Sequence, residues 1–457
     1  MQSRMVTVQP PSVGWLLSLI EDGRIFDVDG SAVDLRDGVS AEAIAQDDGV
    51  IAGTARVGGN EVAIFAQEPS YKGGSMGLKH TKRLEKLVAI ATDRGLPVIG
   101  LYDSGGVRVQ EGGNSLEEAS ALLGQLMKAK DAVPVVNAVM GTTTGAATYS
   151  AYMGDVLVVT RGLSRMFVWG PGVVKAETGA EVGMEELGGA DVQVANGTAS
   201  LAAEGEKESL ELVKRVVGFF ASRQGNPVMP RATVKTEDPL GIIEGTFDAA
   251  SFLEFRSGFA PSVTTGLARL EGRTVGVVAS NRKALRGFMD NNSCKKVSKF
   301  VSMCNSLAVP LVTFLDSPGF YPSAEQERAG LIALSGEAVR EYASDRCPKV
   351  TVVSGEAYGG VFVGFASKAL GAKKVFAYPG ARISVMGLPA FLEIFQKRKL
   401  EALEGEQRTK ELERVSLEFL KQMDPSIGVR LGYIDEIIDP ADTRAKLVAA
   451  FRASDAK

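Results

Sequence analysis

The stretch Val352-Val-Ser-Gly-Glu-Ala-Tyr-Gly-Gly-Val-Phe-Val-Gly364 decides the fold of this chain. Its apolar, β-branched start is typical of a buried strand, and the glycine pair Gly359 and Gly360 is followed by a predicted apolar helix. Residues 135–151 have the same plan. Small residues at a strand-to-helix junction leave backbone N–H groups bare at a helix N-terminus, where they can bind a developing oxyanion. Two such junctions suggest an enzyme that acts on two carbonyl groups.

The rest of the chain repeats around these junctions. Residues 96–103 form a predicted buried strand that ends at an aspartate, and a predicted helix and a second strand lead to the first junction. Residues 309–316 and 347–353 match those two strands. Gly145 follows Asp103 by 42 residues, and Gly360 follows Asp316 by 44. Alternating strands and helices indicate a parallel α/β fold, and the matched spacing indicates a duplication.

The duplication predicts two related domains. Residues 222–230 are polar and contain glycine and proline, which is typical of a linker. We therefore place the boundary near residue 228, with an N-terminal domain over 1–228 and a C-terminal domain over 229–457.

Composition excludes several classes of function. The 457 residues carry 51 basic and 55 acidic side chains, so there is no overall field to attract nucleic acid or an anionic membrane. The three cysteines are far apart and His80 is the only histidine, so no metal site and no histidine-rich catalysis is expected. No apolar run reaches the ~18 residues of a membrane span. We expect a cytoplasmic protein.

Six motifs, in this order, resemble one family. They are residues 73–77 (GGSMG), 103–112 (DSGGVRVQEG), 166–171 (MFVWGP) with 186–190 (ELGGA), 316–320 (DSPGF), 357–360 (AYGG), and 385–387 (VMG) with 433–439 (YIDEIID). The chain is similar to the carboxyltransferase subunits of biotin-dependent acyl-CoA carboxylases, the acetyl- and propionyl-CoA carboxylase β family.

The resemblance implies a fold and a reaction. The fold is a tandem pair of crotonase-like (ClpP/crotonase) α/β domains, each a superhelix of ββα units. The acyl-CoA is expected mainly on the first domain and biotin on the second, with each site completed across a homodimer or within a hexamer of three dimers. The reaction moves CO2 from carboxybiotin to the α-carbon of a short acyl-CoA thioester through an enolate. No metal is required.

The resemblance also implies roles for individual residues. Gly145 and Ala146 would hold the thioester oxygen, and Gly360 and Val361 would hold the biotin carbonyl beside Gly359. The substrate-binding residues are expected to be Gly105, Gly106, Arg108, Tyr358 and Val363. The other interpretation of the glycine pairs is that they only let a helix approach a strand.

The chain departs from the family pattern at the first junction. Thr143-Thr-Gly-Ala146 stands where the family usually has Cys-Ala-Gly-Gly, and Gln193 stands where it usually has histidine. An alanine still offers its N–H, so the oxyanion hole can persist. We predict that the methyl group of Ala146 and the side chain of Val363 tune the accepted acyl chain length.

Other functions stay open. A decarboxylase of the same family, acting on a malonyl-type or glutaconyl-type thioester, would share both oxyanion holes. A catalytically silent scaffold subunit would be favoured by bulky residues at Gly145 or Gly360, which are absent. The chain has no biotinyl Met-Lys-Met sequence and no ATP-binding segment, so the resemblance implies a separate biotin carboxylase and a separate biotin carrier as partners.

Overall fold

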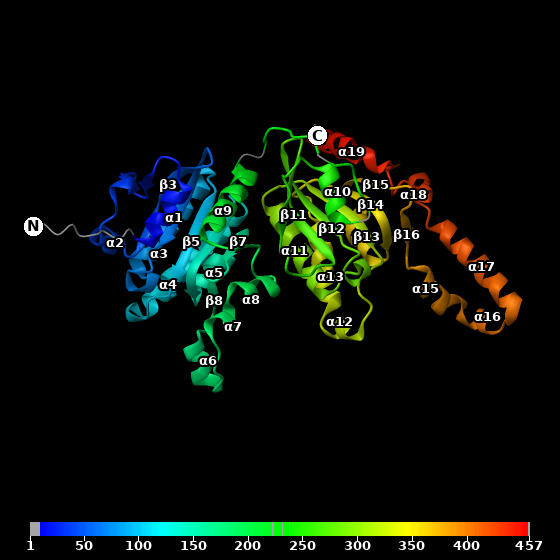
Figure 1. The fold of residues 1–457 in the computed structure, drawn as a ribbon, viewed down its shortest axis with the longest axis horizontal. Coiled ribbons are helices and arrows are strands. Elements are labelled where there is room, and N and C mark those ends of the chain that lie inside the picture. The colour runs from blue at the N-terminus through cyan, green and yellow to red at the C-terminus, as the bar shows by residue number, and fades with distance from the viewer. Residues whose placement is uncertain (1–9, 222–223, 231, 237, 456–457) are drawn as a thin grey trace, which may run out of the picture. The chain divides into compact units, whose positions relative to one another are not determined.

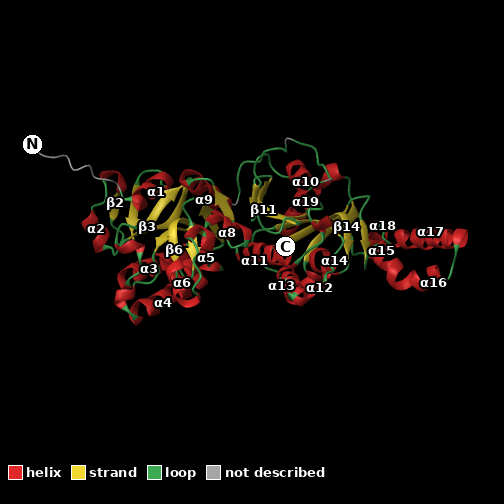
Figure 2. Ribbon diagram, turned by 60° about the horizontal axis from the view of Figure 1, so that its bottom comes forward, coloured by secondary structure: helices red, strands yellow, loops and turns green. Residues whose placement is uncertain are grey.

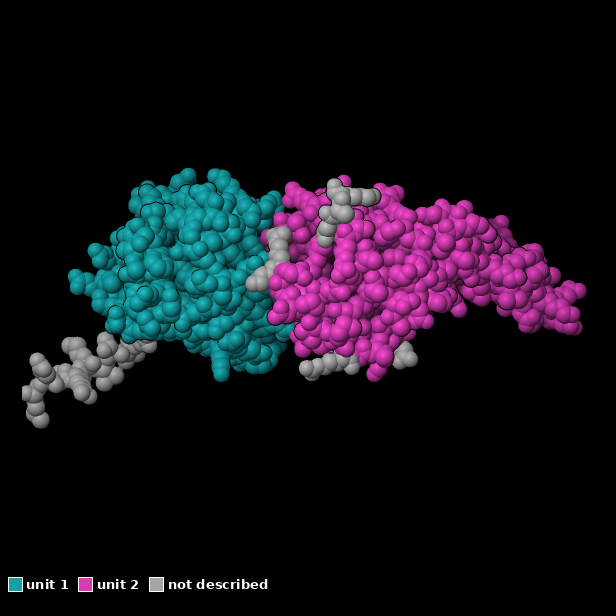
Figure 3. Space-filling view, turned by 90° about the horizontal axis from the view of Figure 1, so that it is seen from above, with its two compact units in different colours: residues 1–223 teal, residues 224–457 magenta. Residues whose placement is uncertain are grey.

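The computed structural model describes residues 10–221, 224–230, 232–236 and 238–455. The chain divides into two compact units, residues 1–223 (unit 1) and 224–457 (unit 2), which Figure 3 colours separately. The linker predicted at 222–230 starts at Ser222 and Arg223, which lie outside the described residues. Gln224 bridges to Arg273, and the Gly225 N–H donates to the Gly272 carbonyl at 2.7 Å, so the following residues attach to unit 2.

Unit 1 holds a nine-stranded sheet in the described residues, in the order β2-β1-β3-β4-β5-β6-β7-β9, with β8 paired to β6 (Figure 1). Its strands are β1 (Arg24–Asp27), β2 (Ala32–Asp34), β3 (Val50–Val57), β4 (Asn60–Gln67), β5 (Val98–Ser104), β6 (Val135–Thr144), β7 (Val156–Thr160), β8 (Arg165–Phe167) and β9 (Leu201–Ala203). Its helices are α1 (Pro11–Leu19), α2 (Ala41–Gln46), α3 (Leu78–Arg94), α4 (Gly113–Lys130), α5 (Ala146–Tyr152), α6 (Pro171–Thr178), α7 (Met184–Gly188), α8 (Ala190–Ala195) and α9 (Glu206–Ala221).

Unit 2 repeats this plan with an eight-stranded sheet over its described part, in the order β10-β11-β12-β13-β14-β15-β17, with β16 paired to β14. Its strands are β10 (Leu253–Phe255), β11 (Val263–Leu270), β12 (Arg273–Ser280), β13 (Leu311–Ser317), β14 (Lys349–Tyr358), β15 (Ala372–Ala377), β16 (Arg382–Ser384) and β17 (Glu436–Ile437). Its helices are α10 (Pro239–Thr246), α11 (Asn291–Ser306), α12 (Ala324–Arg328), α13 (Leu331–Ala343), α14 (Gly360–Ala366), α15 (Leu388–Phe391), α16 (Lys397–Glu401), α17 (Gly405–Gln422), α18 (Pro425–Leu431) and α19 (Thr443–Asp455).

The cores follow from the apolar patterns. Strands β5 and β13 are buried almost throughout, as near-continuous apolar runs in parallel sheets should be. Figure 2 shows the strands of each unit in yellow with the helices around them in red. Helix α3 buries Leu84, Leu87 and Val88 against the sheet of unit 1. Each such side chain contributes about 1.5–3 kcal/mol by leaving water.

The central strand of each unit changes partner near its end. β6 pairs with β5 and β7 along its first half, but Thr142 to Thr144 pair with β8. The last residues of β14 pair with β16 in the same way. The β5–β6 and β13–β14 ladders each shift register just before this change. The sheet is therefore bent at the two positions where the glycine junctions begin.

Candidate active site

The two strand-to-helix junctions have the same backbone conformation. Gly145 precedes α5 with φ 56° and ψ −133°, and Gly359 precedes α14 with φ 57° and ψ −131°. A side chain is strained at such angles, so glycine is required at both positions. Ala146 and Gly360 are consequently the structural counterparts of each other as the first residues of the two helices.

In unit 2 the first turn of the helix presents bare donors. The Gly359 N–H donates to the Ser384 carbonyl of β16 at 2.9 Å. The N–H groups of Gly360 and Val361 have no acceptor among the described residues, because they lie in the first turn of α14. Gly360 and Val361 therefore stay the predicted oxyanion-hole donors of unit 2.

In unit 1 the bare donors lie one residue later than we predicted. The Gly145 N–H donates to the Phe167 carbonyl of β8 at 3.3 Å, just as Gly359 bonds to β16. The N–H groups of Ala146 and Ala147 have no acceptor within the described part of the chain. We therefore assign the donors of unit 1 to Ala146 and Ala147, and the role of Gly145 becomes the turn itself. These two residues and Gly360 and Val361 are called the candidate donors below.

The methyl group of Ala146 does not stand free at this junction. It packs with Val107 against a small apolar cluster of Met76, Ala119 and Ala147. This contact gives the methyl group a packing role that the sequence did not indicate.

The loop after β5 lies directly against the unit 1 junction. A Cβ on Gly106, whose φ is 83°, would lie 2.8 Å from the Thr144 carbonyl oxygen, so only glycine fits there. Gly105 is exposed, and its N–H donates to the Gly73 carbonyl at 2.8 Å. Gly106 thus borders the junction, and Gly105 ties its loop to the glycine-rich segment.

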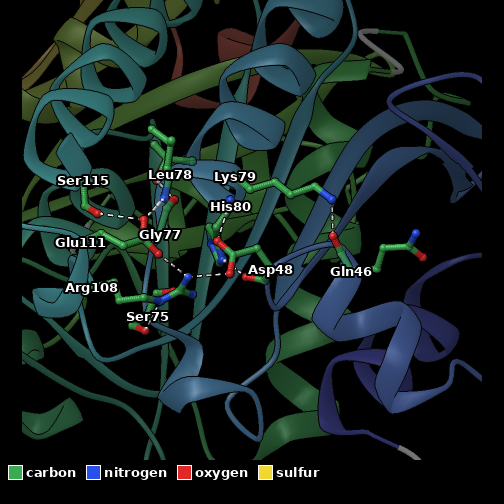
Figure 4. Close-up of polar contacts among 11 residues, drawn as sticks. Gln46, Asp48, Ser75, Gly77, Leu78, Lys79, His80, Arg108, Glu111 and Ser115 are labelled. Carbon is green, nitrogen blue, oxygen red and sulfur yellow. Dashed lines mark hydrogen bonds and ion pairs between the residues drawn. The ribbon is translucent and has the colours of Figure 1, made fainter.

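Arg108 is not available to a substrate, contrary to our prediction. Its side chain is 3% exposed, and its guanidinium contacts Asp48 at 2.5 Å and Glu111 at 2.8 Å (Figure 4). It also donates to the Ser75 hydroxyl at 3.1 Å and the Ser75 carbonyl at 2.7 Å. These bonds occupy the guanidinium from all sides, so Arg108 holds loops together.

A cavity of about 700 Å³ opens at the junction of unit 2. Tyr358, Gly359 and Gly360 line it, together with Arg286, Phe320, Glu356, Arg382 and residues 385–390. A Cβ on Gly360 would lie 2.7 Å from the Phe320 ring, so glycine at this position lets the Phe320 ring pack against the junction. Val363, also predicted to bind substrate, lies outside this lining and is 55% exposed.

The only histidine of the sequence takes no part in these sites. His80 is fully buried, with Nε2 3.2 Å from the Gln67 amide and Nδ1 3.1 Å from the Asp48 carbonyl. Burial lowers the pKa of His80 to about 4, so the ring is neutral near pH 7. Its burial keeps the His80 ring away from any bound substrate.

Asp103 and Asp316 hold the strand bends that precede the junctions. Asp103 accepts the Thr142 N–H at 3.1 Å, and Asp316 accepts the Glu356 N–H at 2.8 Å. The Asp103 carboxylate packs against Gly141, and the Asp316 carboxylate packs against Gly355. A Cβ on either glycine would overlap the carboxylate. The two aspartates were visible in the sequence as strand ends, but the glycine beneath each carboxylate was not.

We expect Asp103→Asn to stabilise unit 1 at neutral pH. Burial raises the pKa of Asp103 from 3.8 to about 6, so the folded protein holds this proton more tightly than the unfolded chain. The ionised Asp103 therefore lowers the free energy of unfolding by an amount that increases between about pH 4 and pH 6 and stays constant at higher pH. Asparagine still accepts the Thr142 N–H, so the variant should gain about 1 kcal/mol at pH 7.5 after allowance for its partial exposure.

Thermal unfolding of this variant and of the parent at pH 4 and pH 7.5 checks this prediction. The gain should vanish at the lower pH. A difference in melting temperature that stays constant between the two pH values would show that ionisation of Asp103 is not its cause.

Over residues 10–221, 224–230, 232–236 and 238–455, no helix is long and apolar enough to cross a membrane. Within the same ranges, no three His, Cys, Asp or Glu side chains gather as a metal ion would need.

Comparisons with known proteins agree over most of the chain. The carboxyl transferase domain family matches residues 25–457. The propionyl-CoA carboxylase beta chain of Roseobacter denitrificans is 35% identical over 425 residues, which cover 88% of this chain and 82% of that protein. The methylmalonyl-CoA decarboxylase subunit alpha of Veillonella parvula is 30% identical over 423 residues, which cover 88% and 81%.

A solved structure confirms the predicted tandem crotonase-like fold. Transcarboxylase 12S, a hexamer crystallised with methylmalonyl-coenzyme A and methylmalonic acid, matches with a TM-score of 0.86 and 29% identity. The match covers 98% of this chain and 90% of that one. The chain therefore belongs to the carboxyltransferase family and is an enzyme subunit of the kind found in acyl-CoA carboxylases.

Proposed function

We propose that this subunit moves a carboxyl group between biotin and the α-carbon of a short acyl-CoA thioester. The observation that carries the proposal is the pair of equivalent junctions, each with two bare N–H groups at a helix start. Both oxygens that gain negative charge in such a transfer, the enolate oxygen and the ureido oxygen, need preorganised donors. The relatives named for propionyl-CoA carboxylase favour a short acyl chain.

The residues of unit 1 are assigned to the thioester. When the α-proton leaves, electron density moves onto the thioester oxygen, and the N–H groups of Ala146 and Ala147 donate to that oxygen. Gly106 borders the junction and leaves it room, because any Cβ there would collide with Thr144. These donors stabilise the enolate more than the neutral thioester, which is the condition for catalysis.

The residues of unit 2 are assigned to biotin. Gly360 lines the 700 Å³ cavity and its N–H has no acceptor among the described residues, which suits a ring with one carbonyl oxygen. Biotin on a separate carrier protein would supply the transferable carboxyl group. Gly360 and Val361 would donate to its carbonyl oxygen, while Gly359 and Tyr358 would form the wall.

A labelled-carboxyl assay tests the proposed function. The purified chain is incubated with methylmalonyl-CoA labelled in its free carboxyl group and with free biotin. We expect the label on biotin and propionyl-CoA as the second product. Label released as CO2 at the same rate without biotin would instead favour the decarboxylase function, which the similarity to the Veillonella parvula subunit keeps open.

We further propose a homodimer at least, and a hexamer of three dimers. Unit 1 exposes Trp169 at 66%, and unit 2 exposes Ile394 at 64% and Phe395 at 63%. Large exposed apolar side chains are typical of surfaces that another protein covers. A separate biotin carboxylase and its carrier complete the enzyme in this proposal. A fully active monomer in analytical ultracentrifugation would contradict the assembly.

We propose that Val363 contacts the acyl chain of a thioester bound to unit 1 of a second subunit, although it lies outside the unit 2 cavity. It is half exposed on α14, two residues after the candidate donor Val361. Val363→Asp should change the ratio of kcat/KM between propionyl- and butyryl-thioesters by about 10–200-fold, the value of one methylene in an apolar pocket. An unchanged ranking of acetyl-, propionyl- and butyryl-thioesters in a variant with the parent's melting temperature would remove Val363 from the pocket.

A further inference from the structure

Four residues form a partly buried clamp beside the first junction: Arg108, Asp48, Glu111 and Ser75. The guanidinium makes two hydrogen bonds to Ser75 and one to each carboxylate, and the Arg108 side chain is 3% exposed. Figure 4 shows the two carboxylates on either side of the guanidinium. An arginine can fill this role because its fork presents five donors in fixed directions.

The two carboxylates of the clamp also cap α3. Glu111 accepts the Leu78 N–H at 2.6 Å, and Asp48 accepts the His80 N–H at 3.1 Å. Both charges lie at the N-terminus of a 17-residue helix, where negative charge is favourable. The clamp therefore fixes the glycine-rich segment before α3 relative to the helix itself.

The clamp reaches the candidate donors through Met76. The Met76 N–H donates to the Gly106 carbonyl at 2.8 Å, and the Arg108 N–H donates to the Met76 carbonyl at 2.9 Å. The Met76 side chain is 1% exposed and belongs to the apolar cluster that contains Ala147 and contacts Ala146. The Arg108 side chain therefore bonds to Ser75, the residue that precedes Met76 in the chain, and the Met76 side chain packs against both donor residues of unit 1.

In unit 2 the position that corresponds to Arg108 is not an arginine. Met289 takes the place of Met76, since its N–H donates to the Gly319 carbonyl at 3.0 Å and its carbonyl accepts the Tyr321 N–H at 2.9 Å. Tyr321 consequently stands where Arg108 stands in unit 1. Its ring contacts Phe288 edge-on at 5.9 Å, and α11 is capped by its own Asp290. The ionic clamp is thus specific to one of the two junctions.

We propose that Arg108 is a positioning residue for the thioester side of the site: it holds Ser75 so that Met76 fixes the N–H groups of Ala146 and Ala147. The inference rests on the proposed function of those donors, but the geometry it requires can be measured without activity. Arg108 touches no substrate in this proposal. Its loss should therefore affect the rate of transfer and leave thioester binding nearly unchanged.

Arg108→Met and Arg108→Lys are compared with Arg83→Met. Arg83 is a matched control on α3, because it also forms a partly buried ion pair with two carboxylates, Asp27 and Asp47. We expect Arg108→Met to lower kcat about 10²-fold, the cost of a misplaced catalytic group, with the Kd of propionyl-CoA by calorimetry within about threefold of the parent's. Arg108→Lys keeps the charge, protects folding and should lose about tenfold, since lysine cannot make the forked contacts.

Double-mutant analysis tests whether Arg108 acts on the donors through Met76 or only by destabilising unit 1 in general. If Arg108 acts through Met76, then Met76→Ala lowers kcat in the same way, and Arg108→Lys combined with Met76→Ala costs less than the product of the two single effects. If the kcat loss of the double variant equals the product of the two single losses, Arg108 does not act through Met76. Equal losses of kcat per folded molecule in Arg83→Met and Arg108→Met overturn the positioning role, and so does a raised Kd at unchanged kcat.

Amide hydrogen exchange tests the geometry independently of catalysis. In Arg108→Lys and Arg108→Met, peptides that span residues 143–152 should exchange at least about tenfold faster than in the parent, whereas in Arg83→Met they should not. Unchanged exchange in both Arg108 variants overturns the proposal. If the parent protein shows no carboxyl transfer at all, the proposed function fails, and the exchange result still decides whether Arg108 positions the junction.

Discussion

Replacement of Gly360 by proline should leave a folded protein that has lost about 10²–10³ in the rate of transfer to or from biotin, the usual cost of one oxyanion-hole donor. Gly360 is the first residue of α14, a position where proline is tolerated because its missing N–H makes no helix bond. The proline variant therefore loses only the hydrogen bond from the residue 360 N–H to the carbonyl oxygen of bound biotin. Initial rates of label transfer to free biotin measure the effect.

Gly360→Ala is the matched control for this prediction. Alanine keeps the N–H, yet its Cβ meets the Phe320 ring at 2.7 Å just as the proline ring would. We expect the alanine variant to lose about tenfold or less, since the far end of a side chain can move aside. Equal losses in the two variants would mean that crowding against Phe320, and not the missing donor, causes the defect.

Replacement of Ala146 by proline should have an equally large effect on the other half of the reaction. Ala146 is the first residue of α5, so proline again removes a donor that the helix does not use. We expect a loss of about 10²–10³ in kcat, with thioester affinity nearly unchanged, because the donor matters mainly once the enolate oxygen is charged. Steady-state kinetics with propionyl-CoA and direct titration of the thioester give both quantities.

Ala146→Gly provides the control, because it keeps the donor and removes only the methyl group from the Met76 cluster. It should cost about 1–2 kcal/mol of stability through lost burial and the flexibility of glycine in a helix. Its kcat should stay within about tenfold of the parent's, by comparison with the loss of a donor. A proline variant as active as this glycine variant would remove Ala146 from the oxyanion hole.

Much of the fold was predictable from local patterns. The apolar runs of residues 96–103 and 309–316 predicted β5 and β13, and the glycine junctions predicted the starts of α5 and α14. The duplication was visible because both halves end a buried strand at an aspartate and reach a glycine junction about 40 residues later. These features depend on neighbours in sequence, which is why a sequence displays them.

The position of the donors depended on contacts that are distant in sequence. Gly145 and Gly359 look like donors from their place at a helix start, but β8 and β16 accept their N–H groups. The family resemblance implied a substrate-binding role for Arg108. Its burial depends on Asp48, 60 residues away, and no local pattern indicates that pairing. The bends of the two sheets at Gly141 and Gly355 were also not predicted, because they depend on contacts with Asp103 and Asp316, which are distant in sequence.

A crystal structure of the protein with a stable propionyl-CoA analogue bound tests the central claim most directly. We expect the thioester oxygen about 2.7–3.1 Å from the backbone nitrogens of both Ala146 and Ala147, the distance at which an oxyanion hole works. We also expect the Arg108 side chain to keep the contacts with Asp48 and Ser75 that it makes without ligand. A thioester oxygen held by any side chain, with the Ala146 and Ala147 N–H groups turned to solvent, would contradict the account.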